Sequence, residues 1–395
     1  SEELIFFLRV FSLLIPITLL SDAMLSILRG YESSLWYSML AYIIHNVVKI
    51  FSIAILLFIG LKAGAVAFSY ILGTIITLII AYIVIKKNIL KFISKSELSR
   101  NNKASLRREL FSYSIPLALS SFAFVIFGWI DTFMIGYYKS PLEVGFYNAA
   151  IPIALLIAML PDLLMKIFTP VINREYSRNN LVLVKELSKQ VGKWIVIVNL
   201  PILILFSLFP GVALNLLFGK ESLPASSALP ILTIGFFISS WFGAIGLRLL
   251  SMAGKSKTIL INTIIGAILN ILLNILFIPM PKILFWNNSL GLVGAATATF
   301  ISVSFMALLL TIQSYYYLRI VPIRRRMLNI VISSVIPLFV LIYIRSKIDM
   351  NVYYLLALTL LFFLLYFALI ILLKGFDRND LLIIRWLKNK IVAKK

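Results

Sequence analysis

Long apolar stretches separated by short polar loops run through the whole chain. Stretches of about 18 or more apolar residues, the length that a helix needs to cross a bilayer, occur eleven times. Stretches of this length fit α-helices rather than the short alternating strands of a membrane barrel. The pattern therefore predicts an all-α, polytopic membrane protein with no sizeable soluble domain. The predicted spans lie near 4–28, 35–59, 62–85, 110–136, 146–172, 190–217, 226–250, 257–279, 290–316, 327–344 and 352–373.

The pattern also repeats within the chain. When Gly30 is aligned with Gly254, a six-residue gap in the following loop brings Gly64 onto Gly294. Spans one to three then match spans seven to nine at constant spacing, as in transporters that are built from repeated lobes. Three spans precede the later copy and none precedes the earlier one. Symmetric lobes would require three more helices, roughly 115 residues, before the start of this sequence.

The repeat predicts a protein of fourteen transmembrane helices, of which eleven are visible here. They would form two six-helix lobes and a terminal helix pair. The predicted parts are the last three helices of the N-terminal lobe (1–85), a cytoplasmic basic linker (86–108), the C-terminal six-helix lobe (109–317), the extra helix pair (327–373) and a cytoplasmic basic amphipathic tail (374–395).

The net charge of +22 is explained by membrane topology rather than by nucleic-acid binding. If the loops are assigned alternately to two faces, one face carries 27 Lys and Arg and the other carries six. This asymmetry follows the positive-inside rule, so the basic face is predicted to be cytoplasmic. The hydrophobic content of 61% and the mean hydropathy of +1.03 agree with a multi-pass protein of the cell membrane.

Residue types that hold metals are scarce. The chain has no cysteine and a single histidine, His45. Disulfides, thiolate metal sites and multi-histidine metal sites are therefore excluded. We expect neither a metal site nor a cofactor.

Charged side chains inside the spans are the first candidates for a site. A charge at mid-bilayer costs about 2.5–3.5 kcal/mol on insertion scales, so it usually faces a cavity or a partner. Asp162 and Lys166 lie four residues apart on one helical face and form either a polar cavity patch or a self-neutralising structural pair. Asp131 could bind a cation or a proton, could hydrogen-bond a sugar, or could be a helix-packing carboxylate.

Two cations in the first two spans complete the predicted substrate-cavity set. Arg9 offers a guanidinium fork that suits a lipid pyrophosphate. Lys49 could serve the same purpose or could extend to the cytoplasmic edge of the membrane. Asn46 and its repeat mate Asn270 suggest hydrogen bonds between helices in both lobes.

Four segments resemble a known group: SYSIPLALSSFAFVIFGWIDTFMIGYY, PLEVGFYNAAIPI, NTIIGAILNILLNILFIP and GLVGAATATFIS. The group is that of the polysaccharide (O-antigen type) flippases of the multidrug/oligosaccharidyl-lipid/polysaccharide exporter superfamily. Its typical Asp late in the seventh helix and the following Gly-x-Tyr-x-x-Ala correspond to Asp131 and residues 145–150. Its Asn-rich helix and the Gly-Ala-Ala that follows correspond to Asn270, Asn274 and residues 294–296.

The resemblance implies a flippase that moves a lipid-linked oligosaccharide, a polysaccharide precursor, across the cytoplasmic membrane by alternating access. Its expected partners are that substrate, membrane lipids and polysaccharide-assembly enzymes, and not nucleic acid. One alternative is a cation-coupled multidrug antiporter of the same superfamily. An alternative of another class is a polytopic membrane glycosyltransferase or acyltransferase. The longest polar loop, 86–109, carries only Glu97 and Glu109, which is too little for such catalysis, and we expect no enzyme.

Overall fold

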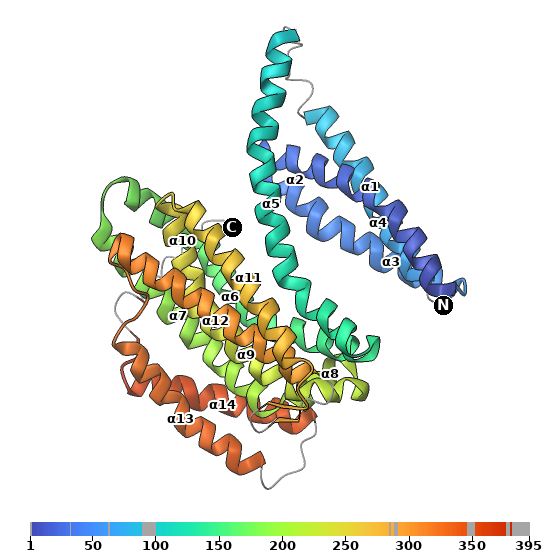
Figure 1. The fold of residues 1–395 in the computed structure, drawn as a ribbon. Coiled ribbons are helices and arrows are strands. Elements are labelled where there is room, and N and C mark those ends of the chain that lie inside the picture. Colours follow the sequence, from blue (N-terminus) through green and yellow to red (C-terminus); the bar gives the residue numbers. More distant parts are fainter. Residues whose placement is uncertain are drawn as a thin grey trace. The chain divides into compact units, whose positions relative to one another are not determined.

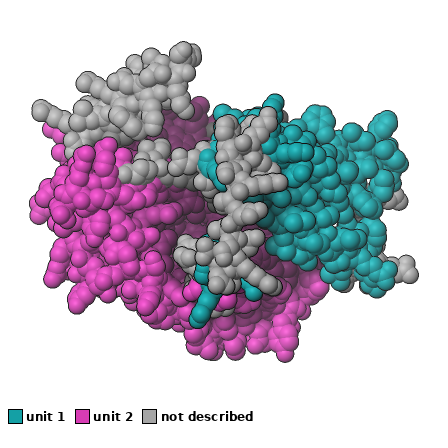
Figure 2. Space-filling view, turned by 90° about the horizontal axis from the view of Figure 1, so that it is seen from above, with its two compact units in different colours: residues 1–109 teal, residues 110–395 magenta. Residues whose placement is uncertain are grey.

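The computed structural model describes residues 2–31, 33–61, 64–88, 100–283, 286–287, 291–345, 352–376 and 380. The chain divides into two compact units, Ser1–Glu109 and Leu110–Lys395, which Figure 2 shows in different colours. Nine helices in the described part are long and apolar enough to cross a membrane. Of the other two predicted spans, one lies within α5 and one corresponds to the shorter apolar run Ala357–Leu372. The predicted all-α polytopic fold is confirmed.

The N-terminal unit consists of three long helical segments. α4 packs against both α1 and α3, and a small apolar core joins α1, η1 and α4. The middle segment is one helix from Ser34 to Phe58 that contains a π-helical turn, η1. The elements are α1 (Glu2–Gly30), α2 (Ser34–Ser38), η1 (Met39–Ile44), α3 (His45–Phe58) and α4 (Gly64–Asn88), followed by α5 (Arg100–Tyr138), which leads into the second unit.

The second unit is a helical bundle with a helix pair beside it (Figure 1). α12 packs against α9, α10 and α11, and α6 packs against α7 and α9. α13 contacts α7 and α14. The elements are α6 (Pro141–Ser177), α7 (Leu181–Leu208), α8 (Pro210–Phe218), η3 (Lys220–Ser227), α9 (Leu229–Ile238), η4 (Ser239–Gly243), α10 (Ala244–Met252), α11 (Ser256–Phe277), β1 (Lys282–Ile283), β2 (Trp286–Asn287), α12 (Leu292–Leu318), α13 (Arg326–Arg345) and α14 (Val352–Leu372).

Small residues allow the central helices of the bundle to approach closely. A Cβ atom placed on Gly235 would lie 2.9 Å from the Cα of Phe300, and one on Gly246 would lie 2.9 Å from the backbone of Leu310. Such contacts are typical of membrane helices, which associate through packing rather than through a hydrophobic driving force. The continuous helix formed by α9, η4 and α10 is thereby held against α12. In the N-terminal unit α4 contacts both α1 and α3.

The predicted span 190–217 differs from the structure. α7 begins at Leu181, because the Asn180 side chain accepts the backbone N–H of Leu183 at 3.3 Å and caps the helix. The helix ends at Leu208, since Pro210 has no N–H and disfavours a helical conformation in the residue before it. A separate short helix, α8, then covers the rest of the predicted span.

The predicted linker and tail are only partly described. α4 continues to Asn88 and α5 begins at Arg100, so both ends of the predicted linker 86–108 are helical. Residues 100–108 contain no Pro or Gly, which agrees with their helical state. Residues 89–99, 377–379 and 381–395 lie outside the described part, and the amphipathic character of the tail stays a prediction.

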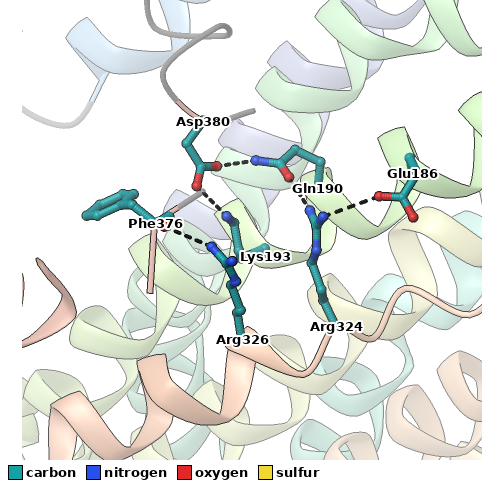
Figure 3. A network of polar contacts seen from close by, with 7 residues as sticks. All are labelled: Glu186, Gln190, Lys193, Arg324, Arg326, Phe376 and Asp380. Atoms are coloured by element: carbon teal, nitrogen blue, oxygen red, sulfur yellow. Dashed lines mark hydrogen bonds and ion pairs between the residues drawn. The ribbon is translucent and has the colours of Figure 1, made fainter. Parts of the chain in front are cut away.

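A polar network joins three segments that are far apart in the sequence (Figure 3). The Lys193 ammonium and the Gln190 amide of α7 both donate to the Asp380 carboxylate, and the side chains of Lys193 and Asp380 are 0% and 1% exposed. Arg324 donates to Gln190 at 2.7 Å and to Glu186 at 3.3 Å. The network connects α7, the residues just before α13 and the segment that follows α14. The charge pattern predicts all three near the cytoplasmic face.

Further hydrogen bonds fix the helix pair to the same region. The Arg326 guanidinium donates to the carbonyl of Phe376 at 3.0 Å, and the Asn329 amide donates to that of Leu373 at 2.9 Å. These bonds tie α13 to the residues that follow α14, and the buried ion pair of Lys193 with Asp380 attaches that segment to α7.

Replacing Lys193 by Met should destabilise the protein strongly, because it leaves the Asp380 carboxylate buried without its cation. Breaking a buried pair in this way costs about 3–5 kcal/mol, whereas an apolar replacement of both partners is much less costly. We expect a lower unfolding midpoint for Lys193→Met in detergent and a largely recovered one for Lys193→Met with Asp380→Leu. Lys189→Met is the matched control, since Lys189 lies 3.9 Å from Glu186 in a more exposed pair. Equal losses in the single variant and the control would contradict a buried, stabilising pair.

Candidate functional site

Asp131 lies at the centre of a buried polar cluster inside the second unit. Its carboxylate accepts hydrogen bonds from the Tyr147 hydroxyl at 2.8 Å, from the Asn274 amide at 2.6 Å and from the Thr299 hydroxyl. The Asn274 amide also donates to Asn270 at 3.1 Å, and the Asn270 amide donates to Thr299 at 3.3 Å. All five side chains are buried.

Four helices supply the cluster, and the local sequence explains how they do so. Asp131 on α5 meets Tyr147 on α6 across a tight turn, where Ser140 caps the N-terminus of α6 and Pro141 opens it. Asn270 and Asn274 lie four residues apart, so both point to one face of α11. Thr299 belongs to α12. In the predicted topology all of these positions lie toward the outer ends of their spans.

In the described part of the chain, neutral hydrogen-bonding groups surround the Asp131 carboxylate and no cation pairs with it. Three hydrogen bonds from neutral groups solvate the charge, but no ion pair to Asp131 occurs in the described part. The Asn274 Oδ1 atom is buried and accepts no hydrogen bond there. Carboxylate, amide and hydroxyl oxygens are the donors that small hard cations prefer, so this set could hold a proton or a small cation.

A cavity lies elsewhere in the second unit. Its volume is about 300 Å³, and its lining is mostly apolar. Asp162, Asn262 and Thr263 contribute polar groups to it, and Asn262 exchanges two hydrogen bonds with Gln313, at 2.5 and 3.0 Å. The π-helical turn η4 forms part of its wall. Such turns occur often at functional sites.

The five predicted site residues are therefore not all in one place. Asp131 is buried in the cluster, and Asp162 lines the cavity. Arg9 is exposed on α1, and the Lys49 ammonium lies 4.5 Å from the centre of the Tyr70 ring. Both belong to the N-terminal unit. The side chain of Lys166 lies outside the described residues. A role of these residues in substrate binding stays a prediction.

The sequence does not show which groups meet Asp131. Tyr147 and Asn274 belong to the motifs that carry the resemblance, and no pattern distinguishes Thr299. The signal that could have found them is polarity at the outer ends of four different spans. In hydrocarbon such groups must meet one another to be satisfied.

Comparisons with known families agree with these features. The family model described as "Polysaccharide biosynthesis protein" matches residues 1–174, and the model described as "MatE" matches residues 116–276. The resemblance to the multidrug/oligosaccharidyl-lipid/polysaccharide exporter superfamily is confirmed. The chain is thus similar over most of its length to families of transporters and flippases rather than of enzymes.

Two uncharacterized membrane proteins of Methanocaldococcus jannaschii are similar in sequence. The first is 29% identical, and the match covers 64% of this chain and 49% of the relative. The second is 25% identical, and the match covers 67% of this chain and 61% of the relative. The chain therefore spans about half to three fifths of these curated relatives. Together with the nine membrane-spanning helices in the described part, they show a multi-pass membrane protein.

Two solved structures share the fold. The structure of "Lipid II flippase MurJ, inward closed conformation" has a TM-score of 0.70 and 20% identity and covers 92% of this chain and 72% of its own. A crystal structure of a MATE mutant has a TM-score of 0.55 and 17% identity, and the match covers 77% of this chain and 66% of that structure's chain. At these identities the likeness concerns the fold.

Tyr147→Phe should destabilise the second unit, because it removes one of the three donors to a buried carboxylate and leaves packing unchanged. The loss of such a bond costs about 1–3 kcal/mol. We expect a lower unfolding midpoint in detergent for this variant. Tyr316→Phe is the control, since Tyr316 is 72% exposed and its hydroxyl is not part of the cluster. An unchanged midpoint for Tyr147→Phe would show that the cluster adds nothing to stability.

Proposed function

We propose that the full-length protein moves a lipid-linked oligosaccharide, a polysaccharide precursor, across the cytoplasmic membrane by alternating access. The observation that carries the transport function is the pairing, within one membrane lobe, of a buried carboxylate cluster and a separate cavity. The match to the polysaccharide biosynthesis family supports the substrate class. So does the structural likeness to a protein named as a lipid II flippase.

Binding of a proton or a cation at Asp131 would connect the cluster to transport. The carboxylate holds together α5, α6, α11 and α12 through its three donors. Neutralising its charge would weaken those hydrogen bonds, since bonds to an ionised acceptor are about twice as strong as neutral ones. The packing of the four helices would then depend on occupancy at Asp131. That dependence is what an ion-driven change between two lobe conformations requires.

Substrate and partners follow from the same proposal. The lipid tail would stay in the bilayer, and basic loops on the cytoplasmic face would attract the pyrophosphate. Further partners are the membrane lipids and the enzymes that assemble the polysaccharide. Arg9, Lys49, Asp162 and Lys166 are proposed as substrate-cavity residues.

Asp131→Asn should reduce ion-driven transport on the order of tenfold, the size of a typical coupling free energy. The amide keeps the size of the side chain but neither carries charge nor exchanges a proton. The assay uses full-length protein in liposomes that contain a fluorescent lipid-linked oligosaccharide. A membrane-impermeant glycosidase then measures how much of it reaches the outer leaflet with and without an ion gradient.

The control for this assay is Glu221→Gln, which removes an exposed carboxylate of η3. It should transport like the wild type at equal protein content. Wild-type transport by Asp131→Asn would show that the cluster is structural only.

The multidrug antiporter is the second candidate, because the MatE model matches residues 116–276 of the second unit and the cavity there is mostly apolar with one carboxylate. This environment also suits a lipophilic cation. The same liposomes distinguish the two functions. Gradient-driven accumulation of tetraphenylphosphonium without movement of the glycolipid would favour the antiporter. Formation of a glycosidic or acyl bond by the pure protein would instead favour an enzyme.

A further inference from the structure

Two prolines interrupt the backbone hydrogen bonding of neighbouring helices in the second unit. Pro161 lies inside α6 and Pro201 lies inside α7, and both helices contain a stretch that is long and apolar enough to cross a membrane. Proline has no N–H group, so Pro161 cannot donate to the carbonyl of Ile157, and Pro201 cannot donate to that of Ile197. Ile157 and Ile197 are fully buried, and each carbonyl therefore needs a donor from elsewhere.

Side chains from other helices supply these donors. The Asn199 amide of α7 donates to the Ile157 carbonyl at 2.8 Å, and the Ser240 hydroxyl of η4 donates to the same carbonyl at 3.4 Å. The Tyr366 hydroxyl of α14 donates to the Ile197 carbonyl at 3.0 Å. All three donor residues are buried. Each proline break is thus held by polar side chains of neighbouring helices.

The two breaks are connected in series. Asn199 stands two residues before Pro201, so the side chain that holds the break in α6 belongs to the interrupted turn of α7. Tyr366 in turn fixes that turn to α14. Ile157, Ile197 and Tyr366 belong to one hydrophobic core. Because such cores are close-packed, a displacement at one of these contacts is transmitted to the others.

The break in α6 lies at the wall of the cavity in the second unit. Pro161 and Asp162 both line this cavity, and so does Ser240. Among the described residues that line it, Asp162 is the one carboxylate. Because Asp162 follows the break directly, the angle between the two halves of α6 determines where its carboxylate stands.

Helix packing alone would not require this arrangement. A regular helix satisfies its own carbonyls and needs neither the prolines nor the added donors. The Oδ1 atom of Asn199 is also buried and accepts no hydrogen bond from the described residues. Unsatisfied buried polar groups are unfavourable, and proteins keep such exceptions to the usual rules mainly at functional sites.

We propose that Asn199 and Tyr366 are positioning residues, which hold the breaks in α7 and α6 and thereby place Asp162 at the cavity. Through Tyr366 the helix pair α13 and α14 acts on a cavity to which it contributes no lining residue in the described part of the chain. The inference rests on the proposed function only where Asp162 is taken to contact the substrate.

The placement of residue 162 is tested with Asp162→Cys, since this sequence contains no cysteine. The rate at which a charged methanethiosulfonate modifies purified full-length protein is measured, and the rate without the introduced cysteine is subtracted. We expect Asn199→Leu and Tyr366→Phe each to change this rate at least about fivefold, the lower end of usual coupling effects. Ser188→Ala should leave the rate unchanged, because the Ser188 hydroxyl is buried on α7 but donates within its own helix. Unchanged rates in both test variants would overturn the proposal.

A second measurement separates positioning from stability. Pro161→Ala restores an N–H that can donate to the Ile157 carbonyl, so it should cancel most of the fall in unfolding midpoint that Asn199→Leu causes alone. A positioning role predicts that the double variant still moves the lipid-linked oligosaccharide at least about fivefold more slowly than the wild type in the liposome assay. Wild-type transport by the double variant would overturn the proposal, since these contacts would then serve stability alone. Changed thiol rates with a wild type that moves no glycolipid would overturn the proposed function and leave the positioning role standing.

Discussion

Hydrocarbon offers no hydrogen-bond partner, and this constraint decides where polar groups stand in the protein. Many hydroxyl groups on the apolar helices satisfy this constraint by donating to a carbonyl of their own helix. Ser69, Ser188 and Thr311, for example, donate to the carbonyl four residues earlier. Groups that cannot be satisfied locally draw distant helices together. Asp131 accepts hydrogen bonds from three donors on α6, α11 and α12, and Lys193 pairs with Asp380, which follows α14.

Polar groups in the spans therefore fall into two kinds with different consequences. At Asp131 neighbouring side chains supply the hydrogen-bond partners of the carboxylate, so a change of its charge would alter the contacts among the helices. Asp162 instead borders a cavity, where a ligand can complete the set of hydrogen-bond partners.

The helices were predictable because each needs only a long apolar run, and that signal is local. The early start and end of α7 were missed, although Asn180 and Pro210 carry the signals for both. The partners of Asp131 could not be derived, since hydrophobic patterning does not state which faces of distant helices meet. Lys193 shows the same limit. Its buried partner lies 187 residues further along the chain, at a distance that no local pattern reports.

That separation has a consequence for how the protein is made. Lys193 leaves the ribosome long before Asp380 exists, and at about 5–20 residues per second the interval is roughly 10–40 s. During this time the ammonium group has no carboxylate partner in its final place. It must stay at the membrane surface or in water, so the start of α7 cannot adopt its final depth while synthesis continues. The second unit is therefore completed only once Asp380 has been made and has reached its place beside Lys193.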